Sequence, residues 1–280
     1  MSTGFRVACV QADLTIGDVQ RNRAHLSDWI GRAVDGGARL VILPEAANAG
    51  YMFHDRTEAR CHAEPIPDGE TVTQWIELAA RYGIWIVGGL TESEGDHVFN
   101  SSVLLGPEGY IGTFRKAHLW NEEKGTYDHD NRGFPVFETA LGRIGLAICY
   151  DAWFPESFRS LALGGADLVA VPANWVPVPN QPGDSLTMAN MMCMTAAHSN
   201  QMYVAAASRI GVERGQSFIG TSMIAGPSGW LLGGPASGVD EELVFADVDL
   251  IGSRQARLGN SFNQPLHDRR PEIYRVNTVE

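Results

Sequence analysis

Three chemically reactive side chains each come directly after an apolar run of the kind that forms β-strands. Glu45, Lys116 and Cys149 follow residues 39–44 (RLVILP), 109–115 (GYIGTFR) and 142–148 (GRIGLAI). If these runs lie side by side in one sheet, its carboxyl edge gathers a carboxylate, an ammonium group and a thiol. Ligands of open α/β sheets bind at that edge. The three groups together are suited to acyl transfer.

The order of predicted elements is nearly the same in the two halves of the chain. Each half begins with strands and helices in alternation and ends with consecutive strands, as the apolar periods indicate. The predicted strands are residues 5–11, 40–43, 84–90, 98–105, 110–114, 143–148, 168–171, 203–207, 217–225, 230–232 and 243–248. The predicted helices are residues 21–34, 70–82, 155–163 and 186–199. Two such units predict an α/β fold layered as helix, sheet, sheet, helix.

The composition excludes several classes of partner. With 21 Lys and Arg against 33 Asp and Glu, the formal charge is −12, whereas nucleic acids and anionic membranes bind a basic face. No apolar stretch approaches the roughly 20 residues of a membrane span, and residues 1–6 lead into too short an apolar segment for a signal peptide. The four cysteines lack paired spacing. We therefore expect reduced thiols in a cytoplasmic protein without nucleic-acid or membrane partners.

Cys149 lies between the end of a strand and the beginning of a helix. Pro155 and Glu156, shortly after it, are typical of a first helical turn. A nearby positive charge or helix amino end lowers the pKa of a thiol from about 8.5, and the thiolate is the nucleophile. The alternative is a buried core cysteine, which is the interpretation favoured for Cys9 and Cys193 because apolar residues flank them.

Glu45 and Lys116 each have a functional and a structural interpretation. Glu45 could act as a general base if burial and a second carboxylate increase its affinity for protons, or it could be a helix cap or a solvated loop residue. Lys116 stands beside Arg115, and strand alternation turns one of the two cations inward. An inward lysine would stabilise a thiolate and an oxyanion, whereas a solvated pair of cations would do neither.

Three segments of the chain resemble the signature segments of the nitrilase or carbon-nitrogen hydrolase superfamily. They are LPEAANAGY, FRKAHLW and GLAICYDAWFPE, and VPANW further along is also similar. The resemblance extends from Val7 to about Asp249. It implies a four-layer αββα sandwich of two mixed sheets, formed as one domain by residues 1–250. Residues 251–280 are expected to be an extension that wraps the domain or a neighbouring subunit.

The resemblance also implies a catalytic triad and a second glutamate. The triad here is Glu45, Lys116 and Cys149. Glu123 in HLWNEEKGTY corresponds to the second glutamate, with Glu122 as the adjacent alternative. The implied reaction hydrolyses a C–N bond through a thioester on Cys149, and Lys116 with the N–H of Tyr150 holds the oxyanion. The resemblance implies no cofactor.

The residues after Cys149 bear on the substrate. Tyr150 and Asp151 stand where enzymes that act on nitriles more often carry Trp and Glu, and Ala152 and Trp153 offer no arginine for the carboxylate of a carbamoyl amino acid. The resemblance therefore implies a small neutral, short aliphatic amide that is split to an acid and ammonia. An N-carbamoyl hydrolase or a nitrilase is the alternative. Aromatic pocket walls are expected from Tyr51, Trp120, Trp153 and Trp175, although each ring could belong to the core instead.

Other interpretations of the chain remain open. His118 or His198 could activate Cys149 in a papain-like hydrolase, although Glu45 and Lys116 would then have no role. A binding protein could keep the same fold without turnover. The histidines form no HExxH motif, so no metal site is expected. Residues 128–131 (DHDN) resemble a cation loop, but the same residues are typical of a turn.

A homodimer is expected from the resemblance. Members of the superfamily commonly pair through helices that flank the nucleophile, which are residues 155–163 and 186–199 in this chain. The second of these carries four methionines that could be exposed, Met188, Met191, Met192 and Met194. A methionine stripe can also belong to the core, so the pattern alone does not decide between the two.

Overall fold

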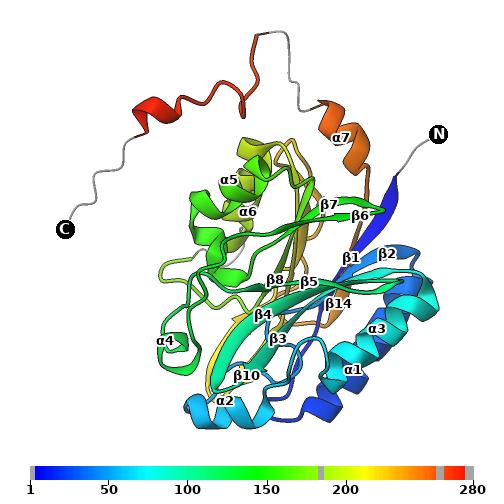
Figure 1. Cartoon of the computed structure of the whole chain (residues 1–280), viewed down its shortest axis with the longest axis vertical. Coiled ribbons are helices and arrows are strands. Elements are labelled where there is room, and N and C mark those ends of the chain that lie inside the picture. The colour runs from blue at the N-terminus through cyan, green and yellow to red at the C-terminus, as the bar shows by residue number, and fades with distance from the viewer. Residues whose placement is uncertain (1–3, 182–185, 257–261, 275–280) are drawn as a thin grey trace.

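Two six-stranded sheets form the centre of the protein in a computed structural model, which describes residues 4–181, 186–256 and 262–274 (Figure 1). The first sheet has the order β14 (Glu242–Val248), β1 (Phe5–Gln11), β2 (Ala38–Ile42), β3 (Trp85–Glu94), β4 (His97–Gly106) and β5 (Gly109–Arg115). The second has the order β13 (Leu231–Gly233), β12 (Met223–Ala225), β9 (Tyr203–Ser208), β8 (Leu168–Ala173), β7 (Gly142–Leu146) and β6 (Val136–Thr139). Both sheets are mixed, because β1, β2 and β3 are parallel, as are β7, β8 and β9, and the other pairs are antiparallel.

Helices cover the outer face of each sheet. α1 (Val19–Asp35) and α3 (Glu70–Tyr82) lie on the first sheet, and α5 (Pro155–Leu163) and α6 (Met188–Asn200) lie on the second (Figure 1). This order of layers confirms the predicted αββα sandwich. The shorter elements are α2 (Arg56–His62), α4 (Glu123–Thr126), α7 (Leu250–Ala256), the hairpin of β10 (Ile210–Glu213) and β11 (Gln216–Ile219), and the 3-10 turns Cys149–Trp153 and Pro271–Ile273. Within the described ranges, no helix is both long and apolar enough to cross a membrane.

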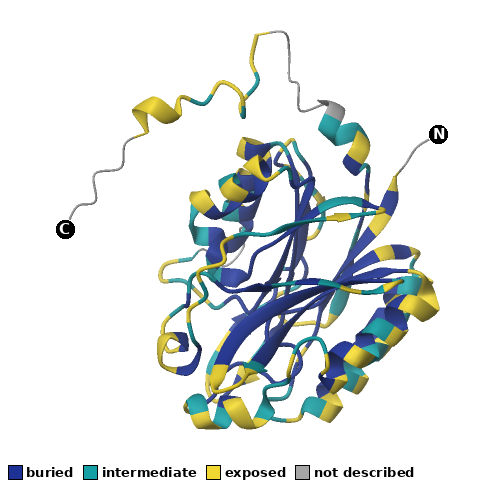
Figure 2. Ribbon diagram, in the orientation of Figure 1, coloured by how far each residue is buried: buried dark blue, intermediate teal, exposed yellow. Residues whose placement is uncertain are grey.

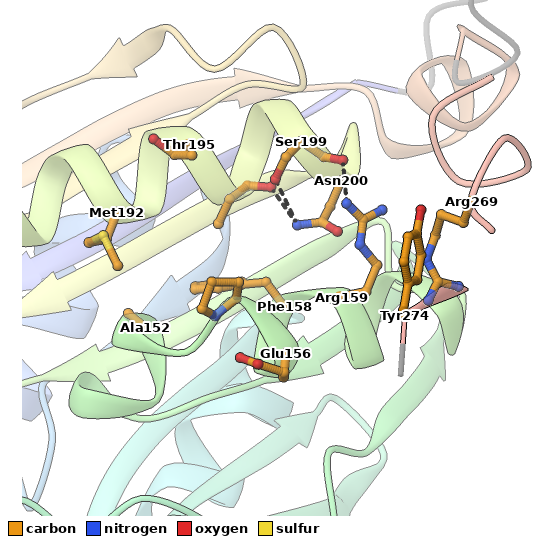
Figure 3. A pocket seen from close by; sticks show the side chains of 12 residues that line it. Ala152, Glu156, Phe158, Arg159, Met192, Thr195, Ser199, Asn200, Arg269 and Tyr274 are labelled. Atoms are coloured by element: carbon orange, nitrogen blue, oxygen red, sulfur yellow. Dashed lines mark hydrogen bonds between the residues drawn. The ribbon is translucent and has the colours of Figure 1, made fainter. Parts of the chain in front are cut away.

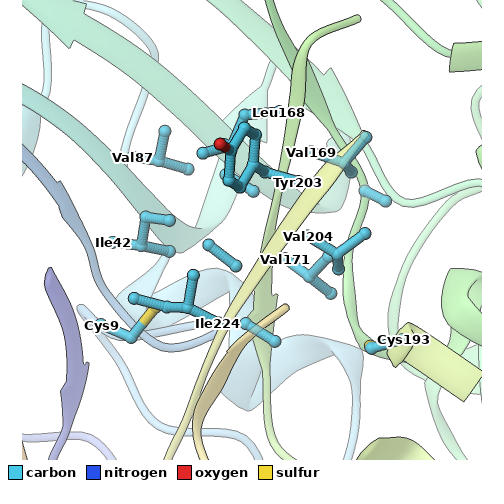
Figure 4. Packing of buried hydrophobic residues seen from close by; sticks show 14 of the residues in the cluster. Cys9, Ile42, Val87, Leu168, Val169, Val171, Cys193, Tyr203, Val204 and Ile224 are labelled. Carbon is cyan, nitrogen blue, oxygen red and sulfur yellow. The ribbon is translucent and has the colours of Figure 1, made fainter. Parts of the chain in front are cut away.

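The core lies between the two sheets and beneath the helices. In β1, Val7 and Cys9 face the second sheet, while Ala8 and Val10 face the helices of the first, as the two-residue period of a strand requires. Both faces of the central strands are therefore apolar and buried, which explains why these strands read as continuous apolar runs (Figure 2). Figure 4 shows side chains of both sheets packed together, with Cys9 and Ile42 of the first near Ile224 of the second.

Three predictions about the second half of the chain need correction. The strand expected at residues 217–225 is two strands, β11 and β12, because Gly220 and Thr221 between them have φ angles of 56° and 58°. β14 does not stay with the second unit but pairs with β1 in the first sheet. No helix was predicted beyond residue 199, yet the segment after Asp249 begins with α7. The described part of the remaining tail, residues 262–274, runs outside the sandwich (Figure 1).

Candidate active site

The three reactive side chains meet although their strands belong to two different sheets. Glu45 follows β2 and Lys116 follows β5 in the first sheet, whereas Cys149 follows β7 in the second. The expectation of one shared sheet edge is therefore wrong, and face-to-face packing of the sheets brings the strand ends together. A direct link is the side-chain amide of Asn174, just after β8, whose Nδ2 donates to the Glu45 carbonyl oxygen at 3.0 Å.

Gly89 in β3 leaves room for the backbone of Glu45. A Cβ atom at Gly89 would lie 2.6 Å from the Glu45 Cα and 2.6 Å from the Pro44 carbonyl oxygen. The Gly89 N–H donates to that carbonyl oxygen at 3.1 Å, and the Ala47 N–H donates to the Gly89 carbonyl oxygen at 2.8 Å. Any larger residue at Gly89 would displace the loop that carries Glu45.

Lys116 is fully buried between two carboxylates. Its Nζ lies 2.7 Å from Glu45 Oε1, 2.7 Å from Glu123 Oε2 and 2.9 Å from Glu123 Oε1. Burial alone would lower the pKa of the ammonium group, but the charges of Glu123 and Glu45 outweigh burial and raise that pKa well above its ordinary value. Lys116 is therefore a fixed positive charge at the centre of the site.

Glu123, rather than Glu122, lies in the site. Glu123 is buried at the first turn of α4, whereas Glu122 is exposed. Glu123 Oε2 also accepts the Trp120 N–H at 2.5 Å. Burial raises the pKa of the Glu123 carboxyl, the Lys116 charge opposes this, and the negative charge of Glu45 adds to the increase. The charges of Lys116 and Glu45 therefore act on the Glu123 carboxyl in opposite directions.

Asn100 in β4 joins the two carboxylates, a role that the sequence analysis missed. Its Nδ2 lies 2.7 Å from Glu45 Oε1 and 2.7 Å from Glu123 Oε1. Glu45 Oε2, by contrast, is buried and has no hydrogen-bond partner among the described residues. The signal in the sequence was a run of three polar residues, 100–102, inside an otherwise apolar strand.

Cys149 opens the 3-10 turn between β7 and α5 with an unusual backbone. Its φ angle is 43°, in the left-handed region that costs an L-residue free energy and is found at functional turns. Burial raises the pKa of the thiol well above its ordinary value and the charge of Glu45 adds to this, while Lys116 and the backbone N–H of Asn174 oppose it. The expected lowering of the thiol pKa is therefore wrong, because burial outweighs the ammonium group. The resting thiol keeps its proton and needs a base.

A cavity of about 170 Å³ ends at Cys149. All five residues expected to bind substrate line it, namely Tyr51, Trp120, Tyr150, Trp153 and Trp175. The remaining lining comes from Asn174 and residues 176–179 (VPVP), so no Asp, Glu, Lys or Arg is among the described residues that line it. Glu45, Lys116 and Glu123 are not among the described residues that line the cavity, but their charges act on the pKa of the Cys149 thiol that does. The site combines a charged interior with an uncharged aromatic mouth.

A buried ion pair holds Tyr51 in place. The N–H groups of Tyr51 and Met52 donate to Glu213 Oε2 at 2.9 and 3.0 Å, and the other carboxylate oxygen of Glu213 pairs with the fully buried Arg209. The Tyr51 ring then lies 5.9 Å from Lys116 Nζ. Arg209 and Glu213 therefore form the support for one wall of the cavity.

The two histidines considered as bases for Cys149, His118 and His198, have partners outside the cavity. His118 Nδ1 lies 2.7 Å from Asp151 Oδ1, and its ring stacks on Phe154 at 3.7 Å. Asp151 also accepts the Ile148 N–H at 2.9 Å, so this carboxylate holds the turn that presents Cys149. His198 lies at the end of α6 with Nδ1 3.0 Å from the Ser228 carbonyl oxygen. Neither histidine lines the Cys149 cavity, which argues against the papain-like interpretation.

The loop that resembled a cation site is held by ion pairs instead. Asp128 pairs with Arg56 at 2.5 Å and with His97 at 3.1 Å, and it accepts the Val98 N–H at 3.0 Å. Asp130 pairs with Arg132 at 2.6 Å. The contacts of Asp128 tie the segment after Glu123 to α2 and to the first residues of β4.

A second cavity, of about 370 Å³, lies between α5, α6 and the C-terminal tail (Figure 3). Arg159 of α5 and Arg269 and Tyr274 of the tail lie at one end of it, and Arg159 donates to the Ser199 carbonyl oxygen at 3.1 Å. Burial lowers the pKa of Arg159, and the positive charge of Arg269 adds to this. None of the predicted catalytic residues lines this cavity.

Comparisons with known proteins show which family this chain resembles over most of its length. A family model described as carbon-nitrogen hydrolase matches residues 6–258. A protein named nitrilase from Pyrococcus abyssi is 40% identical over 269 residues, which cover 96% of this chain and 98% of the relative. The N-carbamoylputrescine amidase of Solanum lycopersicum is 32% identical and covers 92% and 90% of the two chains.

Solved structures include proteins with a similar fold. The crystal structure of an amidase from Nesterenkonia sp. has a TM-score of 0.77 and 26% identity, with 97% of this chain and 95% of that chain covered. Variants of that amidase were solved in complex with butyramide and with the acetamide moiety of fluoroacetamide added covalently at the active-site cysteine.

Proposed function

This chain belongs to the carbon-nitrogen hydrolase family of the nitrilase superfamily, and we propose that it is an amidase that hydrolyses a small neutral amide to an acid and ammonia. The observation that carries the proposal is the placement of Lys116 between the buried carboxylates of Glu45 and Glu123, 2.7 Å from each, behind an uncharged cavity that ends at Cys149. Family membership supports a hydrolase of C–N bonds other than peptide bonds.

In the proposed acylation, the Cys149 thiol attacks the amide carbon while Glu45 takes the thiol proton. The unpartnered Oε2 of Glu45 is the acceptor, since its Oε1 already binds Lys116 and Asn100. Cys149 needs this base because burial raises the pKa of its thiol. The new S–C bond gives a tetrahedral intermediate whose oxyanion is stabilised by the Lys116 charge and the Tyr150 N–H.

In the second half of the reaction, Glu45 returns the proton to the departing nitrogen, and ammonia leaves a thioester on Cys149. Water then attacks the thioester carbon, Glu45 accepts a proton from that water, and the acid departs as the thiol is restored. Glu123 positions the amide.

The size and charge of the cavity support a short neutral amide. About 170 Å³ is less than the roughly 300–1,000 Å³ of pockets that hold drug-sized ligands. A substrate carboxylate would be buried there without a cationic partner, which is costly. The relative from Nesterenkonia sp., whose structures contain butyramide and the acetamide moiety of fluoroacetamide, supports the same class.

An N-carbamoyl amine hydrolase is the second candidate. The relative from Solanum lycopersicum is an N-carbamoylputrescine amidase, and a cationic amine could approach the faces of Trp120, Trp153 or Trp175, which line the cavity. A nitrilase is the third, since the 40% identical relative carries that name. The chemistry at Cys149 is common to all three, so substrate range distinguishes them.

One experiment tests these candidates together. Wild type, Cys149→Ala and Glu45→Gln are mixed with acetamide, butyramide, N-carbamoylputrescine, an N-carbamoyl amino acid and a short nitrile, and ammonia is assayed beside intact-protein mass spectrometry. We expect ammonia from short amides with the wild type alone, and a thioester-sized mass increase on Cys149. Ammonia from the nitrile or the carbamoyl compounds, with none from amides, would replace the amidase proposal. No turnover with any compound would favour the binding-protein interpretation.

We also propose that the protein is a homodimer that pairs through α5 and α6. These helices pack together on the outer face of the second sheet. The exposed apolar side chains on them are Leu163, Met188 and Met191, which are 52%, 40% and 41% exposed. Met192 and Met194 are half-buried, so only part of the predicted methionine stripe is available to a partner. The predicted cytoplasmic location stays a prediction.

A further inference from the structure

Asn100 uses both hydrogens of its side-chain amide on the two carboxylates of the site. We propose that Asn100 is a positioning residue that holds Glu45 and Glu123 together and leaves Glu45 Oε2 as the single atom that can accept the Cys149 proton. The inference rests on the proposed function, because it assigns Glu45 the role of base. It adds a fifth residue, one that acts through Glu45 and Glu123.

The position of Asn100 is set by the strands around it. Asn100 lies opposite Thr91 of β3 in the antiparallel ladder, and its carbonyl oxygen accepts the Lys116 N–H at 2.8 Å. The residue is 1% exposed, and its Oδ1 has no hydrogen-bond partner among the described residues. A flipped amide would turn Oδ1 toward two carboxylates, which repel it. The electrostatics of the site therefore select the orientation in which Nδ2 faces Glu45 and Glu123.

Lys116 alone does not fix the orientation of the two negatively charged carboxylates that contact it. Glu45 and Glu123 both contact Lys116 Nζ, so their carboxylates are close neighbours that repel each other. Lys116 makes one contact of 2.7 Å with Glu45, whereas it makes two contacts with Glu123. Without the amide of Asn100, Glu45 could rotate and present either oxygen to the thiol. The Asn100 bond at 2.7 Å fixes Oε1 as the bound oxygen.

Asn100 also affects the pH at which the base becomes available. A hydrogen bond to an ionised carboxylate favours the ionised form, so loss of the donor makes the carboxylate pair hold a proton more tightly. The titratable groups that act on this pair are Lys116, Cys149, Tyr51 and Tyr127. All are unchanged in an Asn100 variant. A rise in the pH needed for reaction would therefore report on the lost donor.

Alkylation of Cys149 by iodoacetamide tests the inference without turnover of a natural substrate. The Cys149 sulfur forms a bond to the methylene carbon, the C–I bond breaks, iodide leaves with the bonding electrons, and Glu45 Oε2 takes the thiol proton. A Cys61→Ser background removes the exposed thiol, and the buried Cys9 and Cys193 are followed by peptide mapping. Rates are measured from pH 5 to 9 by mass spectrometry, beside acetamide hydrolysis.

Four variants are compared in that background. Asn100→Ala removes the donor, and Asn100→Leu keeps a side chain of similar shape, removes the donor and adds no titratable group. Glu45→Gln shows the rate without the base. Asn22→Ala is the matched control, since Asn22 is also buried and donates twice, at 2.8 and 3.0 Å, but to the carbonyl oxygens of Thr15 and Asn48.

We expect both Asn100 variants to alkylate Cys149 about 100-fold more slowly than wild type at pH 7. The acidic limb of their pH profile should move up by about one unit or more. Amide hydrolysis should lose kcat with KM within about threefold. Asn22→Ala should lower the melting temperature but leave the alkylation rate of Cys149 and the acidic limb of its pH profile unchanged. If Asn100→Ala does not fold, Asn100→Leu decides alone.

The inference is overturned if Cys149 in the Asn100 variants is alkylated at a rate within twofold of wild type. It is also overturned if the Asn100 variants lose no more rate than Asn22→Ala and the acidic limb of their pH profile does not move. Failure of the proposed function looks different. If wild type and Glu45→Gln alkylate Cys149 equally fast, Glu45 is not the base, and the inference falls with that assignment.

Discussion

Arg115 and Lys116 are adjacent in the chain, and both are buried against different carboxylates. Arg115 Nε lies 2.9 Å from Glu92 Oε2, whereas Lys116 Nζ lies 2.7 Å from Glu45 Oε1. The Arg115 guanidinium also covers the ring of Phe99 at 3.7 Å. Strand alternation explains the division, since successive side chains point to opposite faces. Arg115 and Glu92 therefore form a buried salt bridge on the face opposite to the one that Lys116 takes.

Replacement of Cys149 by Ala should abolish turnover and spare the fold. Loss of the nucleophile leaves only binding and electrostatic effects, and activity should fall by more than about 10,000-fold. Cys193→Ala is the control, because Cys193 is also a buried thiol but lies on α6 and does not line the cavity that ends at Cys149. Ammonia release and thermal unfolding are measured on both. Substantial activity in Cys149→Ala would refute the assignment of the nucleophile.

Replacement of Lys116 by Met should destabilise the protein because two carboxylates lose their positive partner. Glu45 and Glu123 would remain buried without their counter-charge, and breaking a buried ion pair costs about 3–5 kcal/mol. Adding Glu123→Gln removes one negative charge, so the double variant should be more stable than Lys116→Met while both lack activity. Urea unfolding at pH 7 gives the comparison. Equal stability of the two variants would show that repulsion between the carboxylates is not the cause.

The ion pair of Asp128 should make stability depend on pH below about 4. The hydrogen bond from Arg56 lowers the pKa of Asp128 to about 2, with the Val98 N–H and His97 also contributing. In the unfolded chain an aspartate titrates near 3.9. The ionised form therefore stabilises the fold fully above about pH 4, and this contribution is lost as the pH falls through about 2.

Thermal unfolding of wild type and Asp128→Asn from pH 2 to 7 checks this dependence. The difference between them should be constant above about pH 5 and shrink toward pH 2. Its size should not exceed about 1 kcal/mol, because the pair is partly exposed and screened by solvent. A difference that grows as the pH falls would contradict the assignment.

A charge on α6 should dissociate the proposed dimer. Met191→Asp places a carboxylate on the exposed face of that helix, where a partner would bury it without a counter-charge. Tyr82→Asp on α3 is the control, since Tyr82 is 39% exposed and Met191 is 41% exposed. Sedimentation velocity measures the oligomeric state. If wild type is a monomer, or if Met191→Asp remains dimeric, the interface lies elsewhere.

Local signals were sufficient to predict most of the fold. β1, α3 and α5 begin and end at the predicted residues, because their apolar periods are regular and Gly69, Gly83 and Pro155 mark their ends. The short β10 and the helix α2 were missed, since elements of 4 and 7 residues show too little periodicity. The pairing of β14 with β1 joins residues far apart in the chain, and no local pattern specifies such a contact.

The residues of the candidate site could be predicted where a reactive side chain directly follows a strand. Glu45, Lys116 and Cys149 were found in this way, and the resemblance to the superfamily added Glu123. Asn100 was not found, because it lies inside a strand and its importance comes from contacts with Glu45 and Glu123. The thiol pKa was predicted in the wrong direction for a similar reason. Proximity to a positive charge can be inferred from sequence, but the degree of burial that outweighs it cannot.

β14 comes from the second half of the chain but pairs with β1 in the sheet of the first half. This pairing limits how the chain can be divided into fragments. A fragment that ends near residue 140 would contain α1, α3 and five strands of the first sheet, yet the edge of β1 that pairs with residues 242–248 would be bare. Such an edge invites association with other chains. We therefore expect the halves to unfold as one cooperative unit despite their similar order of elements. Separated fragments should recover a native sheet only when the fragment that supplies β14 is added back.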